Sequence, residues 1–177
     1  MRVGTIASVI LLSAATAASP AYAQDFHLGL AGGGVFPVGK LDSSYTAGRS
    51  GLVSLSIGSE DAVIGVRLDY QYDEFKGKTL NGNTIPDFHV NSTTLNIVAP
   101  FRVGYAKPYI IGGFGRYPLN IPGTKKETDW GGNIGGGIAF PIPGTTIGGF
   151  VEARYHDVNR SNTSPYHFVP VTLGVQF

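Results

Sequence analysis

Two segments of the chain each place an acidic and a basic side chain two positions apart. Arg67 and Asp69 lie in one segment, and Glu152 and Arg154 lie in the other. Side chains two positions apart point to the same face of a β-strand, so each pair shares a face. Charges removed from water are costly unless they are paired. We therefore expect the four side chains to form one network of ion pairs in an enclosed interior.

A second set of residues has the side-chain types that hydrolysis uses. His156 ends a segment of alternating residues, and Asp157, Ser161 and Ser164 follow it closely. A histidine can activate a nearby hydroxyl as a nucleophile. This is the one arrangement that would suit an enzyme. We expect a protein without enzymatic activity, because isolated histidines near a surface are mostly inert.

No cofactor and no metal are expected. The chain has four histidines and no cysteine, and the histidines lack the spacing of metal ligands. Gly34 and Gly39-Lys40 fit the spacing of a phosphate-binding loop. Leu41 stands where that loop needs a hydroxyl for magnesium, so we interpret the match as a strand that enters a loop.

Strands with a period of two residues must position these side chains. Val169, Val171, Leu173, Val175 and Phe177 share one face of the last segment, while small or polar residues share the other face. The same pattern predicts eight strands of about 9–12 residues, the length that a tilted strand needs to cross a bilayer. They lie near residues 26–36, 49–57, 62–72, 92–101, 108–117, 130–140, 147–156 and 169–177.

The predicted connections alternate in length, which is typical of membrane barrels. The short ones are residues 58–61, 103–106 and 141–146, and the long polar ones are residues 38–48, 73–91, 118–129 and 157–165. Aromatic residues at the predicted strand ends would form a girdle at each membrane interface. They are Tyr70, Tyr72, Trp130 and Tyr155 at the long-loop end, and Phe26, Tyr105, Phe140 and Phe177 at the short-turn end.

A sheet in lipid must close, because an open edge would leave backbone groups unpaired. Closure gives the strands an apolar face towards lipid and a polar face towards a lumen. Eight strands enclose a lumen that side chains can fill. Arg102 and Arg116 are candidates to join the ion pairs there. The alternative is a soluble, secreted lipocalin-like barrel that turns its apolar face inward around a ligand.

The first residues have the layout of a secretory signal peptide. Arg2 precedes an apolar run from Val9 to Ala18, and Ala21-Tyr22-Ala23 is a cleavage signal before Gln24. We expect a signal peptide at residues 1–23 and one barrel domain at residues 24–177. Removal of Arg2 takes the 13 Lys and Arg residues to 12, against 12 Asp and Glu. This neutral balance does not suggest a nucleic-acid partner.

The chain resembles a known family in these features. The last strand, Val169 to Phe177, and the stretches Lys107 to Gly115 and Val151 to Tyr155 are similar to strands of the small outer-membrane barrels related to the OmpA barrel domain and OmpX. The resemblance implies an all-β fold, an eight-stranded antiparallel up-and-down transmembrane β-barrel in the outer membrane of a Gram-negative cell. It also implies that the terminal strand is recognised by the barrel-assembly machinery through Val169, Val171, Leu173, Val175 and Phe177.

The expected function is structural, with a lumen plugged by side chains and loops that contact partners outside the cell. Loops on a rigid scaffold often carry recognition. The basic residues Lys76, Lys78, Lys125 and Lys126 are the expected contacts, and the phosphates of lipopolysaccharide are a candidate partner. A narrow ion channel stays open as an alternative. So does an enzyme that modifies lipid A, although Val158 departs from the His-x-Ser pattern of the deacylase family.

Overall fold

The computed structural model describes residues 25–58, 63–80, 82–101, 103–120, 127–160 and 164–177. The predicted signal peptide, residues 1–23, lies outside the described residues. Almost all of the described chain is strand. The strands are β1 (Asp25–Val38), β2 (Tyr45–Gly58), β3 (Gly65–Gly77), β4 (Thr79–Leu80), β5 (Asn83–Thr84), β6 (Phe88–Pro100), β7 (Lys107–Asn120), β8 (Glu127–Pro141), β9 (Gly148–Asn159) and β10 (Tyr166–Gln176). A short 3-10 helix, η1 (Gly39–Leu41), follows β1.

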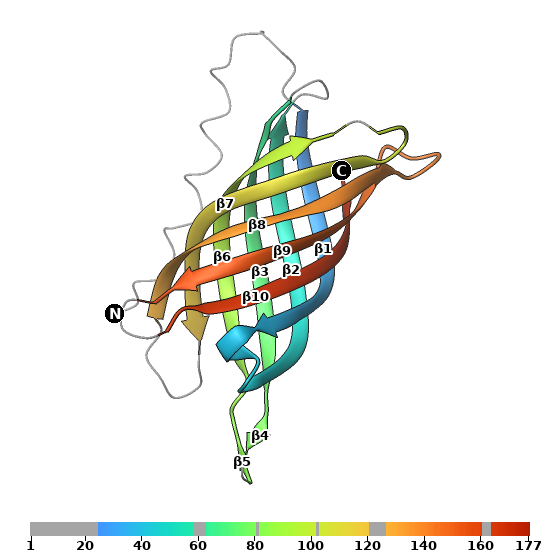
Figure 1. The fold of residues 1–177 in the computed structure, drawn as a ribbon. Coiled ribbons are helices and arrows are strands. Elements are labelled where there is room, and N and C mark those ends of the chain that lie inside the picture. The colour runs from blue at the N-terminus through green and yellow to red at the C-terminus, as the bar shows by residue number, and fades with distance from the viewer. Residues whose placement is uncertain (1–24, 59–62, 81, 102, 121–126, 161–163) are drawn as a thin grey trace, which may run out of the picture.

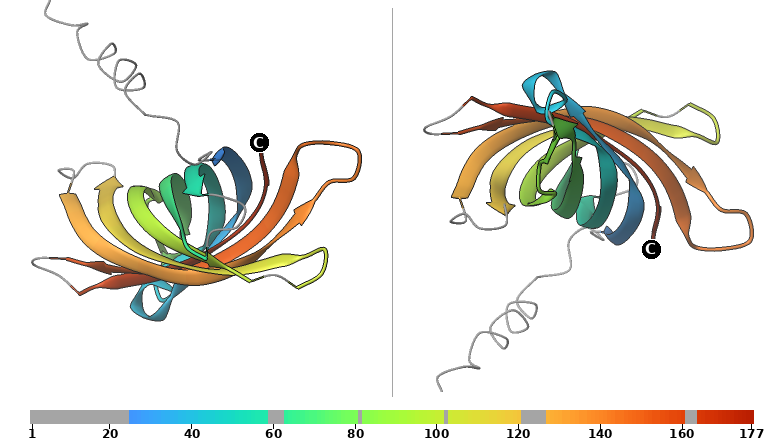
Figure 2. Two further views of the ribbon diagram at one scale, coloured as in Figure 1. Left: turned by 90° about the horizontal axis from the view of Figure 1, so that it is seen from above. Right: turned by 90° about the horizontal axis from the view of Figure 1, so that it is seen from below.

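The eight long strands among the described residues form a closed antiparallel barrel in the order β1-β10-β9-β8-β7-β6-β3-β2 (Figure 1). Strands that follow each other in sequence pair with each other, and β1 pairs with β10 to close the wall. In that closing pair Gly29 lies opposite Gln176 and Val38 lies opposite His167. Figure 2 shows the strands curving round one interior when the barrel is seen from either end. The predicted eight-stranded up-and-down barrel is confirmed.

The strands run further than the sequence pattern predicts. For example, β2 begins at Tyr45 rather than near residue 49, and β3 continues to Gly77 rather than ending near residue 72. Backbone pairing does not depend on apolar side chains, so the strands continue beyond the segments in which the alternation is clear. Turns end them where the chain needs positive φ, as at Gly39 and Gly144.

The predicted contrast in loop length is therefore wrong at most positions. The connections 39–44, 121–126 and 160–165 are no longer than the connections 59–64, 101–106 and 142–147 at the opposite end. The exception is the segment between β3 and β6, where β4 and β5 form a small hairpin that projects beyond the barrel wall (Figure 1). We call the end with this hairpin the hairpin end, and the opposite end, where β1 begins and β10 ends, the short-turn end.

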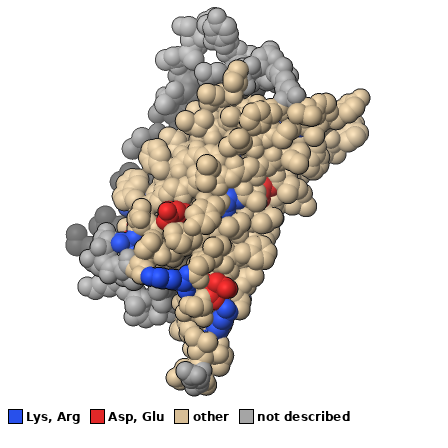
Figure 3. All heavy atoms as spheres, viewed as in Figure 1, with Lys and Arg blue, Asp and Glu red and all other residues tan. Residues whose placement is uncertain are grey.

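The outer face of the wall is mostly apolar, and the inner face holds a set of buried charges. Leu173 is 61% exposed and Leu95 is 48% exposed, whereas Asp69 and Glu152 are almost fully buried. In Figure 3 the charged side chains lie in the middle and lower parts of the visible face, and the upper part shows none. The predicted girdle residues Trp130, Tyr70 and Phe26 are also exposed. This orientation is the reverse of the lipocalin alternative.

The described residues include no helix that is both long and apolar enough to cross a membrane.

Candidate functional site

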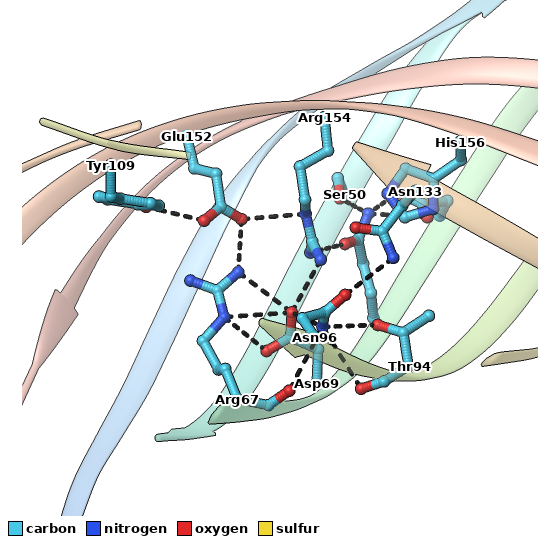
Figure 4. A network of polar contacts seen from close by, with 12 residues as sticks. Ser50, Arg67, Asp69, Thr94, Asn96, Tyr109, Asn133, Glu152, Arg154 and His156 are labelled. Atoms are coloured by element: carbon cyan, nitrogen blue, oxygen red, sulfur yellow. Dashed lines mark hydrogen bonds and ion pairs between the residues drawn. The ribbon is translucent and has the colours of Figure 1, made fainter. Parts of the chain in front are cut away.

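The four charged residues from the sequence prediction come from opposite sides of the barrel. Arg67 and Asp69 belong to β3, and Glu152 and Arg154 belong to β9. Three strands separate β3 from β9 whichever way round the wall one counts. All four side chains point inward, where they meet across the full width of the lumen (Figure 4). The network therefore ties together two strands that the backbone does not pair.

Short contacts link the four charges. Arg67 Nη2 donates to Glu152 Oε1 at 2.7 Å, and Arg154 Nη1 donates to Asp69 Oδ2 at 2.8 Å. Within each strand, Arg67 Nε lies 2.9 Å from Asp69 Oδ1 and Arg154 Nε lies 3.0 Å from Glu152 Oε1. Two cations thus alternate with two anions. This arrangement offsets the cost of taking four charges out of water.

Neutral side chains extend the network to the other strands. Asn96 on β6 donates to Asp69 Oδ2 at 3.0 Å, and Asn133 on β8 donates to the side-chain oxygen of Asn96 at 2.9 Å. Tyr109 on β7 donates to Glu152 Oε2 at 2.7 Å, and Gln71 on β3 accepts from Arg154 Nη2 at 2.6 Å. A layer of polar contacts therefore crosses the barrel at mid-height. We call it the polar layer; its other members are Ser50, Asp73 and Thr94.

Glycines on the inner face of β8 make room for the large side chains. A Cβ at Gly131 would lie 2.8 Å from Cε2 of Tyr117, and a Cβ at Gly135 would lie 2.8 Å from Cγ of Arg154. Tyr109 lies against Gly137 in the same way. The small residues on β8 thus let the neighbouring strands β7 and β9 fill the interior.

A cluster of buried aromatic and apolar side chains lies in the lumen between the polar layer and the hairpin end. Phe75 stacks on Phe88 with ring centroids 4.8 Å apart and meets the edge of Phe168 at 5.5 Å. The His156 ring stacks on Phe168 at 4.8 Å, and its Nδ1 lies 2.9 Å from the hydroxyl of Tyr117. We call this set the aromatic plug; its buried apolar members are Val35, Phe75, Phe88, Val90, Tyr117, Leu119, Val158, Tyr166 and Phe168.

The sequence interpretation missed the aromatic plug, although the chain carries a signal for it. The inward positions of β3 continue past Asp69 through Asp73 to Phe75, and those of β9 continue past Arg154 to Val158. The inner face thus changes from charged to apolar towards one end. The prediction stopped before that change because it began the loops at residues 73 and 157.

A cavity of about 520 Å³ occupies the lumen at the short-turn end. Its deepest lining residues are Ser54, Arg67, Tyr109 and Phe150, all of which are buried. Residues of the turns 101–106 and 142–147 also line it. We call this cavity the vestibule. From one end to the other, the interior therefore consists of the vestibule, the polar layer and the aromatic plug.

Of the two arginines named as further lumen candidates, only Arg116 lies within the described residues, and it does not join the network. Arg116 is exposed on the outer face of β7, because Gly115 and Tyr117 take the inward positions on either side of it. Its assignment to the lumen is wrong. Arg102 lies outside the described residues.

The catalytic candidate is not assembled among the described residues. His156 is fully buried within the aromatic plug, while Asp157 on the same strand points to the outer face. Ser164 is near the surface, where it accepts a hydrogen bond from Lys40 Nζ at 3.1 Å. Ser161 lies outside the described residues. The His156 ring is therefore not exposed at the surface of the barrel. No group of three or more His, Cys, Asp or Glu residues in the described ranges is placed to hold a metal ion.

Two of the expected loop contacts, Lys76 and Lys78, lie at the hairpin end, where both are engaged within the chain. Lys76 Nζ lies 2.7 Å from Asp87 Oδ2 and 2.8 Å from Glu74 Oε1. Lys78 Nζ donates to the backbone carbonyl of Asp42. The hydrogen bonds from Lys76 and from the Gly77 N–H lower the pKa of the Asp87 carboxyl. Lys125 and Lys126 lie outside the described residues.

The proposed assembly residues alternate along the outer edge of β10. Val171, Leu173 and Phe177 are exposed on the outer face, and Val169 and Val175 are half-buried. The Phe177 backbone exchanges two hydrogen bonds with Leu28 on β1, at 2.9 Å and 3.1 Å. The end of the chain is thus held in the wall.

Solved structures of small outer-membrane barrels share this fold. Neisserial surface protein A aligns with a TM-score of 0.63 at 16% identity, over 88% of this chain and 98% of that chain. A major outer membrane protein from Thermus thermophilus gives a TM-score of 0.52 at 14% identity, over 88% and 99%. The outer membrane protein Ail of Yersinia pestis gives 0.51 at 17% identity, over 86% and 100%. Neither a protein-family model nor a curated protein matches the sequence.

The fold defines the class of protein. Strands in a bilayer need hydrogen-bonded backbone groups and an apolar surface towards the lipid. A closed barrel with an apolar outer face meets both requirements. The chain therefore has the fold of the small outer-membrane β-barrels, and its apolar outer face suits a bilayer.

Proposed function

We propose that the protein is a structural and surface-interacting barrel, with no enzymatic activity and with a lumen closed to solute flow. The observation that carries this proposal is the arrangement of two barriers in series. The polar layer joins β3 to β9 across the lumen, and the aromatic plug fills the lumen beyond it. Eight strands leave an interior that such side chains can fill, whereas water-filled pores use about twice as many strands.

The short-turn end is proposed to face the periplasm and the hairpin end to face the outside. Membrane barrels of this class have short turns inside and longer loops outside. The β4–β5 hairpin supports this orientation, because it makes the one connection that is clearly longer than the others. The orientation would place the vestibule on the periplasmic side.

The hairpin end is then the proposed surface for partners. Arg49 keeps three quarters of its side chain exposed there, and Lys76 keeps about half. Such cations suit the phosphates of lipopolysaccharide. Lys125 and Lys126 are proposed as further contacts from the sequence alone. No nucleic-acid partner is proposed.

The last strand is proposed as the signal for the barrel-assembly machinery. Its support is the row of apolar side chains on the outer face, from Val169 to Phe177. Replacement of Phe177 by Ser should lower the amount of folded protein in the membrane, whereas Thr172→Ser on the inner face should not. Equal yields of both variants would contradict the proposal.

Single-channel recording in planar bilayers tests the closed lumen. We expect no steady conductance steps from the wild-type protein, because an ion would have to cross the polar layer and the aromatic plug. The double variant Phe75→Ala/Phe168→Ala shortens the barrier and should conduct more often. Steady steps from the wild type, unchanged in that variant, would favour the narrow channel instead. A changed lipid A mass profile in cells with the protein would favour the enzyme.

A further inference from the structure

The described residues that line the vestibule include basic side chains and no acidic ones, unlike those of the polar layer. The vestibule's described lining residues include Arg67, Lys107 and His27 but no aspartate or glutamate. Its walls also carry apolar side chains, among them Val98 and Phe150. A volume of about 520 Å³ falls within the range of about 300–1,000 Å³ that is usual for small-molecule sites.

The floor of the vestibule presents hydrogen-bond donors. Arg67 is 6% exposed, and its Nε and Nη2 atoms are used by Asp69 and Glu152. Figure 4 shows Arg67 and Tyr109 at one end of the network and His156 at the other. Because Arg67 lines the vestibule, that end of the network is the one that borders it. The edge of a buried guanidinium, beside the Tyr109 side chain, therefore borders the vestibule on this side.

The Glu152 carboxylate lies behind the floor of the vestibule, where its oxygens are bound to other residues. Glu152 Oε1 accepts from Arg67 and lies 3.0 Å from Arg154 Nε, and Glu152 Oε2 accepts from Tyr109. Both oxygens are thus occupied. A ligand that reaches the floor meets the guanidinium edge first, and guanidinium groups bind carboxylates and phosphates strongly.

We propose that the vestibule binds a small organic anion, with its carboxylate or phosphate on the guanidinium edge of Arg67 and its apolar body against Phe150 and Val98. The site goes beyond the structural role, which needs no ligand. A negative result here would leave the closed lumen and the surface role untouched.

Titration calorimetry on the wild-type barrel in zwitterionic nanodiscs tests the site. Phenyl phosphate and benzoate serve as probes of the two head groups, and benzyl alcohol serves as the neutral analogue. We expect saturable binding of at least one anion, and at least tenfold weaker binding of benzyl alcohol.

Three variants test the site. Ser56 lines the vestibule opposite Arg67 in the β2–β3 register and belongs to none of the Arg67 ion pairs, so Ser56→Leu should weaken anion binding at least tenfold while both carboxylate partners of Arg67 stay in place. Thr93→Leu adds similar bulk on the outer face of β6 and should leave binding unchanged. Arg67→Gln should also abolish binding if the barrel still folds.

Three results would overturn the proposal. The first is the absence of saturable binding of either anion to the wild type. The second is equal affinity for the anions and for benzyl alcohol, because binding would then not depend on a negative charge that Arg67 can pair with. The third is undiminished binding in Ser56→Leu, which would place the probe elsewhere.

Discussion

Arg154 is the residue whose loss should cost the polar layer most. It is nearly fully buried and contacts Asp69, Glu152 and Gln71. Arg154→Met leaves an excess of buried negative charge, which should lower the free energy of unfolding by about 3–5 kcal/mol. Urea unfolding of the refolded barrel in lipid vesicles measures this loss.

The matched control is Arg49→Met on the outer face of β2. The Arg49 side chain is largely exposed and pairs with Glu74 at 2.6 Å. Solvent screens such a pair, so its loss should be much smaller. Equal losses in the two variants would mean that the buried ion pairs do not hold the barrel together.

Phe168 should be the most sensitive position of the aromatic plug. It is fully buried and contacts the rings of Phe75, Tyr117, His156 and Tyr166. Phe168→Ala should lower the free energy of unfolding by about 3–5 kcal/mol, through the lost contacts and the cavity left behind.

Phe36→Ala provides the comparison for Phe168, because Phe36 lies on the outer face of β1 and is 47% exposed. Lipid tails can take the place of its ring, so the same unfolding experiment should give a clearly smaller loss. The plug would not be a packed core if the two substitutions had the same effect.

At the scale of the strand, the glycines of β8 set how closely the wall can pack against the interior. A Cβ at Gly135 would lie 2.6 Å from the Arg154 Cα and 2.8 Å from its Cγ. Gly135→Ala should therefore displace Arg154 or the β9 backbone and lower the free energy of unfolding by about 1–3 kcal/mol.

Gly51 on β2 serves as the control for this effect. A Cβ there would meet nothing within 4 Å, and the backbone does not have positive φ. Gly51→Ala should leave stability unchanged or raise it slightly, since alanine restricts the unfolded chain. The packing argument fails if heat-modifiable migration on a gel shows the same loss of folded barrel for both variants.

The strand pattern could be predicted because alternation is a local property of the sequence. Leu173 and Thr172 differ in polarity, and the bilayer requires that difference to appear on opposite faces. The same rule placed Arg67, Asp69, Glu152 and Arg154 on the inner face. Their meeting across the lumen depends on the closure of the wall, which sets β3 opposite β9.

The aromatic plug and the vestibule could not be derived from alternation alone. The plug depends on where the strands end, and the strand ends followed backbone pairing to Gly77 and Asn159 rather than the apolar pattern. Arg116 was misplaced because Gly113 and Gly115 leave the inner face of β7 without a polar signal. The vestibule depends on how far the side chains of Arg67 and Tyr109 reach into the lumen.

For the whole molecule, the central claim is that the apolar face of each strand looks outward and the polar face looks into the barrel. The chain has no cysteine, so single cysteines can carry a nitroxide label without background. Leu55 and Ser56 are adjacent on β2 and point to opposite faces, with Leu55 exposed on the outer face and Ser56 lining the vestibule.

Accessibility of the nitroxide to oxygen and to a water-soluble nickel complex, measured by electron paramagnetic resonance in lipid vesicles, tests that claim most directly. Oxygen concentrates in hydrocarbon, and the nickel complex stays in water. We predict that oxygen, and not the nickel complex, speeds the relaxation of nitroxide labels at Leu55→Cys and at Leu173→Cys. The nickel complex, and not oxygen, should speed the relaxation of the label at Ser56→Cys. The claim about orientation would be contradicted if oxygen did not reach the labels at the two leucines while the label at Ser56→Cys lay in hydrocarbon.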